Sequence, residues 1–157
     1  MAQMPAPAGG GPGGRVRVRR RYGLPWQVVF RAWVEPARLA AWFGPQGHTV
    51  PEYRAEVVPG GSYRLTLRAP DQSEHTVSGT YLAVEPPGRL AFTWVEEREG
   101  REASESVVEV RLSPERGGTL LVLEHGPLAT TELLESHRRA WRSTLDSLAL
   151  ALAEDPP

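Results

Sequence analysis

Two different hydrophobic periods divide the chain into helical and extended parts. Between residues 25 and 45, apolar residues recur three and four positions apart, which predicts two short amphipathic helices. Pro25 opens the first helix and Pro36 stops it, while Gly44 and Pro45 end the second. Helices this short are not stable alone in water, so their Trp and Phe side chains must be buried against a larger body.

Alternation of apolar and polar residues predicts one strand before this helix pair and six antiparallel strands after it. In the first strand, from residue 15 to residue 22, valines alternate with arginines. We expect the six later strands at about residues 50–58, 62–68, 75–84, 90–94, 108–112 and 119–125, separated by turns rich in Gly and Pro. The polar run 96–105 is expected to form an exposed hairpin tip. One apolar and one polar face per strand is the pattern of an antiparallel sheet that is wetted on one side.

A single long helix is predicted from about residue 131 to residue 153. Its apolar stripe includes Leu134, His137, Trp141 and Leu145 at helical spacing. A helix of about 22 residues is roughly 33 Å long, which is enough to cross a curved sheet. The sequence therefore predicts an α+β domain: a curved antiparallel sheet of about seven strands wrapped on a long C-terminal helix, with two short helices after the first strand. The space between helix and sheet is either filled by side chains or open to a ligand.

Composition limits the classes of partner. The net charge of -1 gives no general attraction to nucleic acid or to an anionic membrane, and no apolar stretch approaches the roughly 18 residues of a membrane span. The chain has no Cys, which excludes disulfides and thiolate metal sites. We expect no nucleic-acid partner, no membrane insertion and a cytoplasmic location. Residues 1–14 contain only small residues, Gln and Met and are expected to be a disordered tail, which leaves one domain over residues 15–153.

Two histidines are the candidate polar groups of the space under the long helix. His125 ends the last predicted strand on its inner face and His137 lies on the inward stripe of the helix, so the two could face one another. They could orient a ligand or transfer a proton, or they could bond to neighbouring groups and hold the helix to the sheet. The sequence has no HExxH pair and no GxSxG motif, so no metal, no cofactor and no catalytic residue is expected.

Five blocks of sequence follow one another in a recognisable order: PWQVVFRAWVEPARLAAWFGP, VVPGGSYRL, GTYLAVEPPGRLAFTWV, GTLLVLEHGPL and HRRAWRSTLDSLALAL. Together they resemble bacterial proteins related to the C-terminal domain of the activator of the heat shock protein 90 ATPase. The resemblance covers about residues 15–153 and implies the helix-grip fold of the START-like, birch-pollen-allergen-related (SRPBCC) superfamily. One departure is Ala140, which stands before the helix Trp141 where many such sequences carry Gly.

The resemblance also implies a general function. Members of this superfamily bind lipids, sterols, polyketides or other apolar molecules under the long helix, and a minority are cyclases, aromatases or hydrolases. The related co-chaperones contact their chaperone through a further N-terminal domain. Only residues 1–14 stand in that place here, so we do not expect a chaperone contact.

The expected function is therefore binding of a small hydrophobic or amphipathic ligand, of lipid, polyketide or aromatic type, with no catalysis. The alternatives are a cyclase- or hydrolase-type enzyme that uses His125 and His137, and a protein-interaction module for a chaperone or a transcriptional regulator. A homodimer is compatible with each of them. The expected pocket residues lie on the inner faces of the strands and of the long helix: Tyr53, Tyr63, Leu65, Leu67, Tyr81, Phe92, Trp94, Val108, Leu121, Leu123, His125, His137 and Trp141.

Overall fold

An open, curved antiparallel sheet and three helices make up residues 14–154, which is the part of the chain that the computed structural model describes. The strands are β1 (Gly14–Tyr22), β2 (Thr49–Ala55), β3 (Ser62–Arg68), β4 (Glu74–Glu85), β5 (Arg89–Arg98), β6 (Arg101–Glu102), β7 (Ser106–Glu115) and β8 (Gly118–Leu128). The helices are α1 (Trp26–Val34), α2 (Pro36–Trp42) and α3 (Thr131–Glu154). Of the expected tail at residues 1–14, residues 1–13 lie outside the described residues, and Gly14 is the first residue of β1.

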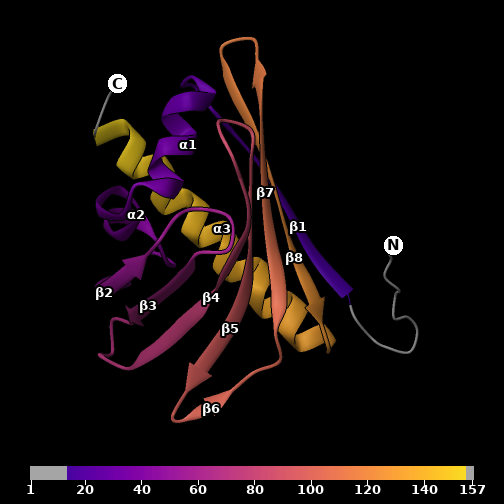
Figure 1. Cartoon of the computed structure of the whole chain (residues 1–157). Coiled ribbons are helices and arrows are strands. Elements are labelled where there is room, and N and C mark those ends of the chain that lie inside the picture. The colour runs from indigo at the N-terminus through magenta and orange to yellow at the C-terminus, as the bar shows by residue number, and fades with distance from the viewer. Residues whose placement is uncertain (1–13, 155–157) are drawn as a thin grey trace.

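The sheet curves around α3. The strand order is β1-β8-β7-β5-β4-β3-β2, every pairing is antiparallel, and β6 pairs only with β5. Figure 1 shows α3 crossing the hollow of the sheet, with α1 and α2 beside the C-terminal half of α3. This is the α+β helix-grip arrangement that the sequence predicts, with seven long strands and the additional short β6.

The helix pair forms where the prolines and glycine predict it. Pro25 is the N-cap of α1, Pro36 is the first residue of α2, and Gly44 follows with a positive φ of 103°. The rings of Trp33 and Trp42 meet edge to face with centroids 4.8 Å apart, and Nε1 of Trp42 donates to the carbonyl of α1 residue 32 at 3.0 Å. The two helices therefore bury their indoles against each other and against the sheet.

The long helix is anchored to the sheet mainly through its middle and C-terminal turns. Trp141, Leu145 and Leu148 are almost completely buried, and the hydroxyl of Tyr22 on β1 donates to the carbonyl of Leu145 at 3.0 Å. The first turns of α3 are less covered: no residue from 131 to 140 is fully buried, and His137 is partly exposed. One end of the space under α3 is thus more open than the other.

The polar run 96–105 is not the exposed hairpin tip that its composition predicts. β5 continues to Arg98 and β6 pairs back onto it, so the tip shrinks to Glu99 and Gly100, both with positive φ. Glu96 has the same strand parity as Trp94 and therefore faces inward, where it is half-buried. A charged residue that composition assigns to the surface lies under the helix.

Candidate functional site

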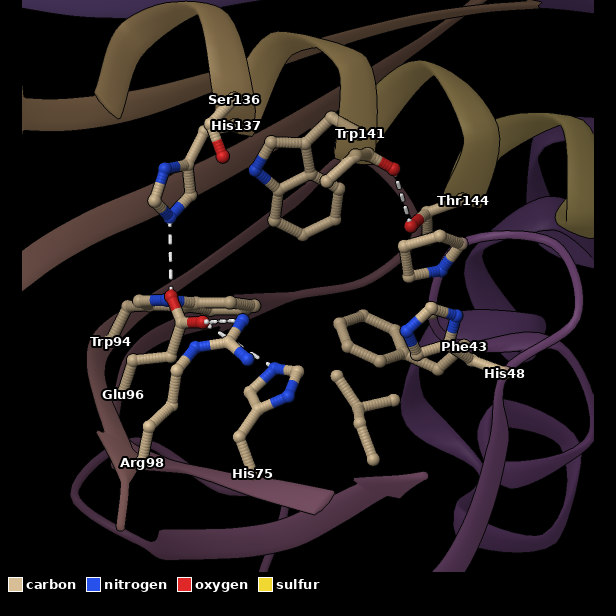
Figure 2. A pocket seen from close by; sticks show the side chains of 14 residues that line it. Phe43, His48, His75, Trp94, Glu96, Arg98, Ser136, His137, Trp141 and Thr144 are labelled. Atoms are coloured by element: carbon tan, nitrogen blue, oxygen red, sulfur yellow. Dashed lines mark hydrogen bonds and ion pairs between the residues drawn. The ribbon is translucent and has the colours of Figure 1, made fainter. Parts of the chain in front are cut away.

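A cavity of about 110 Å³ lies between α3 and the part of the sheet formed by β3, β4 and β5. Its walls come from these four elements and from the loop between α2 and β2, as Figure 2 shows. The lining residues are Phe43, Gly44, Pro45, His48, Leu67, His75, Trp94, Glu96, Arg98, Ser136, His137, Ala140, Trp141 and Thr144. The cavity thus combines aromatic and aliphatic surface with one cluster of charged and imidazole groups.

Glu96 is the centre of that cluster. Its Oε1 accepts hydrogen bonds from Nε1 of Trp94 at 3.3 Å and from Nε2 of His137 at 3.2 Å. Its Oε2 accepts from Nη2 of Arg98 at 3.1 Å and lies 3.4 Å from Nε2 of His75. Three hydrogen bonds and one close imidazole contact therefore surround the two carboxylate oxygens.

The hydrogen bonds of the cluster stabilise the charged forms of Glu96 and His137. Burial by itself raises the pKa of Glu96, but hydrogen bonds from His137 and Trp94 outweigh burial and lower that pKa to about 2. Burial likewise acts to lower the pKa of His137, but its hydrogen bonds to Glu96 and to the carbonyl of Leu133 raise it overall. The distance from Nδ1 of His137 to that carbonyl is 3.0 Å. The Glu96–His137 pair therefore joins β5 to α3 as a hydrogen-bonded ion pair.

His125 lies directly behind this pair and is fully buried. Its ring stands at 90° to that of His137 with centroids 4.9 Å apart, which confirms that the two histidines face one another. Nε1 of Trp141 donates to Nδ1 of His125 at 2.9 Å, and Nε2 lies 2.8 Å from Oγ of Ser106. An indole nitrogen can only donate, so Nδ1 carries the lone pair and Nε2 carries the hydrogen that Ser106 accepts.

This arrangement limits the chemistry of His125. Burial, followed by the charge of His137, lowers the pKa of His125 to about 3, so its ring is neutral. Its only lone pair is taken by Trp141, so no nitrogen is left to accept a proton from a substrate. His125 holds β7, β8 and α3 together, which is the structural role considered for it on the sequence.

A wider groove of about 500 Å³ adjoins the cavity at the N-terminal end of α3. Cavity and groove share Trp94, Glu96, Arg98, Ser136 and His137 among their lining residues. The remaining wall of the groove comes from the turn around β6 and from the residues between β8 and α3. Cavity and groove therefore adjoin at the Glu96 cluster, and the groove adds the charged residues Glu99, Arg101 and Glu102 to the lining.

The predicted pocket residues fall into three places. The cavity is lined by Leu67, Trp94, His137 and Trp141. A separate void of about 20 Å³ is lined by Tyr53, Tyr63, Leu65, Tyr81 and Phe92. The remaining predicted residues belong to the core and do not line the cavity: Val108, Leu121, Leu123 and His125. Since a single water needs about 10–15 Å³, the void beside the tyrosines is too small for a ligand.

Sequence reasoning missed several groups of the site, among them His75, Glu96 and Arg98. A signal for two of them was present. Glu96 continues the inner parity of Phe92 and Trp94, and His75 has the inner parity of Val77 on β4. Both residues could have been found by continuing the alternation of inner and outer positions through the polar ends of the predicted strands.

Among residues 14–154, no group of three or more His, Cys, Asp or Glu side chains is placed to hold a metal ion. In the same range, none of the helices has both the length and the apolar character needed to cross a bilayer.

A curved sheet gripping one long helix, with a cavity beneath that helix, defines a START-like helix-grip protein. Residues 24–153 match the family described as Activator of Hsp90 ATPase homolog 1-like protein, and the chain belongs to this family. No curated protein matches the sequence closely enough to count as a relative.

Solved structures agree with this assignment. The AHSA1 protein from Silicibacter pomeroyi is 29% identical, with a TM-score of 0.82 over 91% of this chain and 100% of that one. CalU16 from Micromonospora echinospora is 32% identical, with a TM-score of 0.68 over 88% of this chain and 76% of that one. A protein from Nitrosomonas europaea, at 23% identity, a TM-score of 0.77 and coverage of 90% and 95%, shares the fold.

Proposed function

We propose that the protein binds one small, largely apolar molecule, with its apolar end in the cavity under α3 and its more polar end in the adjoining groove. The observation that carries this proposal is the cavity of about 110 Å³ lined by Phe43, Leu67, Trp94 and Trp141. A concave, mostly apolar surface is the common property of small-molecule sites, and a few polar groups in it orient the ligand.

The volume sets the size of the ligand. Drug-sized ligands occupy pockets of about 300–1,000 Å³, whereas an engineered apolar cavity of about 150 Å³ holds benzene. A cavity of about 110 Å³ therefore takes one ring or a short chain, and not a sterol or a complete lipid tail. Any larger part of the ligand would lie in the groove of about 500 Å³ beyond Glu96 and His137.

The hydrogen bonds favour binding over the cyclase- or hydrolase-type alternative. His125 has both ring nitrogens occupied, by Trp141 and by Ser106. His137 has both occupied as well, by the carbonyl of Leu133 and by Glu96. A general acid or base must reach the reacting group with a free position, so neither ring is arranged for proton transfer to a ligand.

The proposal is tested by filling the cavity from the helix. Ala140 lines the cavity, whereas Ala149 on the same helix is exposed, and Ala and Leu have similar helix propensities. Toluene added to the wild type should shift the indole N–H resonances of Trp94 and Trp141. Ala140→Leu should abolish these shifts and Ala149→Leu should preserve them.

Two results would contradict the proposal. One is the absence of any indole shift in the wild type up to the solubility limit of toluene. The other is an equal response in the Ala140→Leu and Ala149→Leu proteins. Mass spectrometry of gently purified protein provides a further check, because a co-purified ligand of the predicted size should be released on denaturation.

A further inference from the structure

We propose that the ligand of this site is a neutral single-ring aromatic molecule with a hydroxyl group, a phenol, whose hydroxyl donates a hydrogen bond to Nδ1 of His75. This inference rests on the proposed function and adds the chemical class of the ligand. It follows from which hydrogen-bonding positions in the cavity are already used and which remain accessible.

The first step is the state of the His75 ring. The side chain is only 10% exposed, lines the cavity from β4, and points its Nε2 at Oε2 of Glu96 (Figure 2). At 3.4 Å this contact is not a hydrogen bond, but the negative charge beside Nε2 favours the tautomer that carries the hydrogen on Nε2. Burial, and after it the charge of Arg98, lower the pKa of His75, which keeps the ring neutral.

The second step is the nitrogen that remains. In a neutral imidazole with its hydrogen on Nε2, Nδ1 is an acceptor. Within the part of the chain that the structure describes, Nδ1 of His75 forms no hydrogen bond, and it does not belong to the polar atoms sealed away from solvent. Thr144 offers a second acceptor, because its hydroxyl hydrogen is donated to the carbonyl of Ala140 at 2.7 Å. Nδ1 of His48 also lacks a partner, but it is sealed away from solvent. The two acceptors that remain accessible, on His75 and Thr144, therefore suit a ligand that donates.

The third step is the charge of the ligand. Aromatic walls with a carboxylate suit organic cations in other proteins, but here the two positive charges of Arg98 and His137 outweigh the single negative charge of Glu96 and would repel a cation. An ionised carboxylic acid has no hydrogen to donate to Nδ1 of His75. A neutral donor meets neither obstacle.

The fourth step is the shape. Phe43, Trp94 and Trp141 form adjacent walls, with ring centroids 5.4–6.3 Å from one another. Aromatic rings favour offset and edge-to-face contacts, so a flat ring can add to this cluster without displacing it. With about 110 Å³ available, one six-membered ring with one substituent is the matching size.

The experiment compares phenol with toluene, which has the same shape but carries a methyl group in place of the hydroxyl. Affinities are measured by NMR titration of the wild type, His75→Leu and Ala149→Leu. The phenol-to-toluene affinity ratio should fall about tenfold in His75→Leu, as expected for the loss of one hydrogen bond. It should not change in Ala149→Leu, because Ala149 is exposed and does not line the cavity. His75→Gln, whose amide oxygen is again an acceptor, should restore part of the ratio.

Direct evidence does not require a variant. In the wild type, phenol should shift the ¹⁵N resonance of His75 Nδ1 and toluene should leave it in place. Binding of toluene without binding of phenol, or an unchanged ratio in His75→Leu, overturns the assignment of a phenol but leaves the proposed function standing. Binding of neither compound overturns the proposed function itself.

Discussion

Trp141 and His125 are joined by the hydrogen bond that ties the long helix to the last strand. Nε1 of Trp141 donates to Nδ1 of His125 at 2.9 Å, and both side chains are buried. This hydrogen bond fixes the tautomer of His125 and holds Trp141 in its place beside the cavity. The contribution of the hydrogen bond to stability can be measured separately from the loss of the indole ring.

Trp141→Phe removes the donor and leaves a buried nitrogen without a partner, so we expect a loss of about 1–3 kcal/mol beyond the cost of the smaller ring. Trp33→Phe is the matched control. Trp33 is equally buried, but its Nε1 has no hydrogen-bond partner within the described residues. Urea denaturation of both variants provides the comparison. Equal losses would mean that the hydrogen bond contributes nothing.

His125 should make the protein sensitive to acid. Its pKa is lowered from 6.5 to about 3 by burial first and then by His137, so the unfolded chain takes up a proton near pH 6.5 and the folded chain does not. The free energy of unfolding should therefore fall as the pH is lowered, by roughly 1.4 kcal/mol per pH unit from this group. His125→Gln should show a shallower slope between pH 6.5 and 5.5, measured by urea denaturation at each pH. An unchanged slope would show that the wild-type ring titrates normally.

His137 should affect the free energy of unfolding at higher pH than His125 does, and in the opposite direction. Because its pKa is raised in the folded state, its contribution is complete below the ordinary value of 6.5 and is lost as the pH rises through the raised value. In an NMR titration, the His137 ring should deprotonate above pH 6.5 while the His125 ring stays neutral throughout. A midpoint for His137 below 6.5 would contradict the ion pair with Glu96.

Glu96→Gln should destabilise the protein and lower the pKa of His137. The amide cannot balance the charges of Arg98 and His137, and hydrogen bonds to charged groups contribute about 1.5–3 kcal/mol each. Glu97→Gln is the control on the same strand, since Glu97 forms no ion pair among residues 14–154. Thermal or urea unfolding should separate the two variants by at least about 1 kcal/mol, and similar stabilities would argue against a central role for Glu96.

Gly44→Ala should cost more than Gly60→Ala. Both glycines have positive φ, 103° and 86°, which costs an L-residue about 1–2 kcal/mol. A Cβ at Gly44 would in addition lie 2.8 Å from Cδ2 of Leu67 and 3.2 Å from Cβ of His48, whereas one at Gly60 meets nothing within 4 Å. Gly44→Ala should also weaken toluene binding, because it pushes Leu67 into the cavity. Equal stability of the two variants would show that the loop relaxes freely.

The sequence by itself determined the elements and their order. The spacing of Trp26, Phe30 and Trp33, broken by Pro36, specifies two short helices, and period-two alternation specifies the strands. These signals are local: each depends on the backbone geometry of a few consecutive residues. The family blocks added the helix-grip topology, and the facing of His125 and His137 followed from strand and helix parity.

Only the tertiary structure decided how much space remains under α3 and what faces it. The tyrosines at positions 53, 63 and 81 share inner parity with the cavity residues but close up around a void of about 20 Å³. His75, Glu96 and His137 come from β4, β5 and α3 and meet only because the helix crosses the sheet at that point. Periodicity fixes the side of an element on which a residue lies, but the crossing of distant elements and the packing of rings fix the distances between residues.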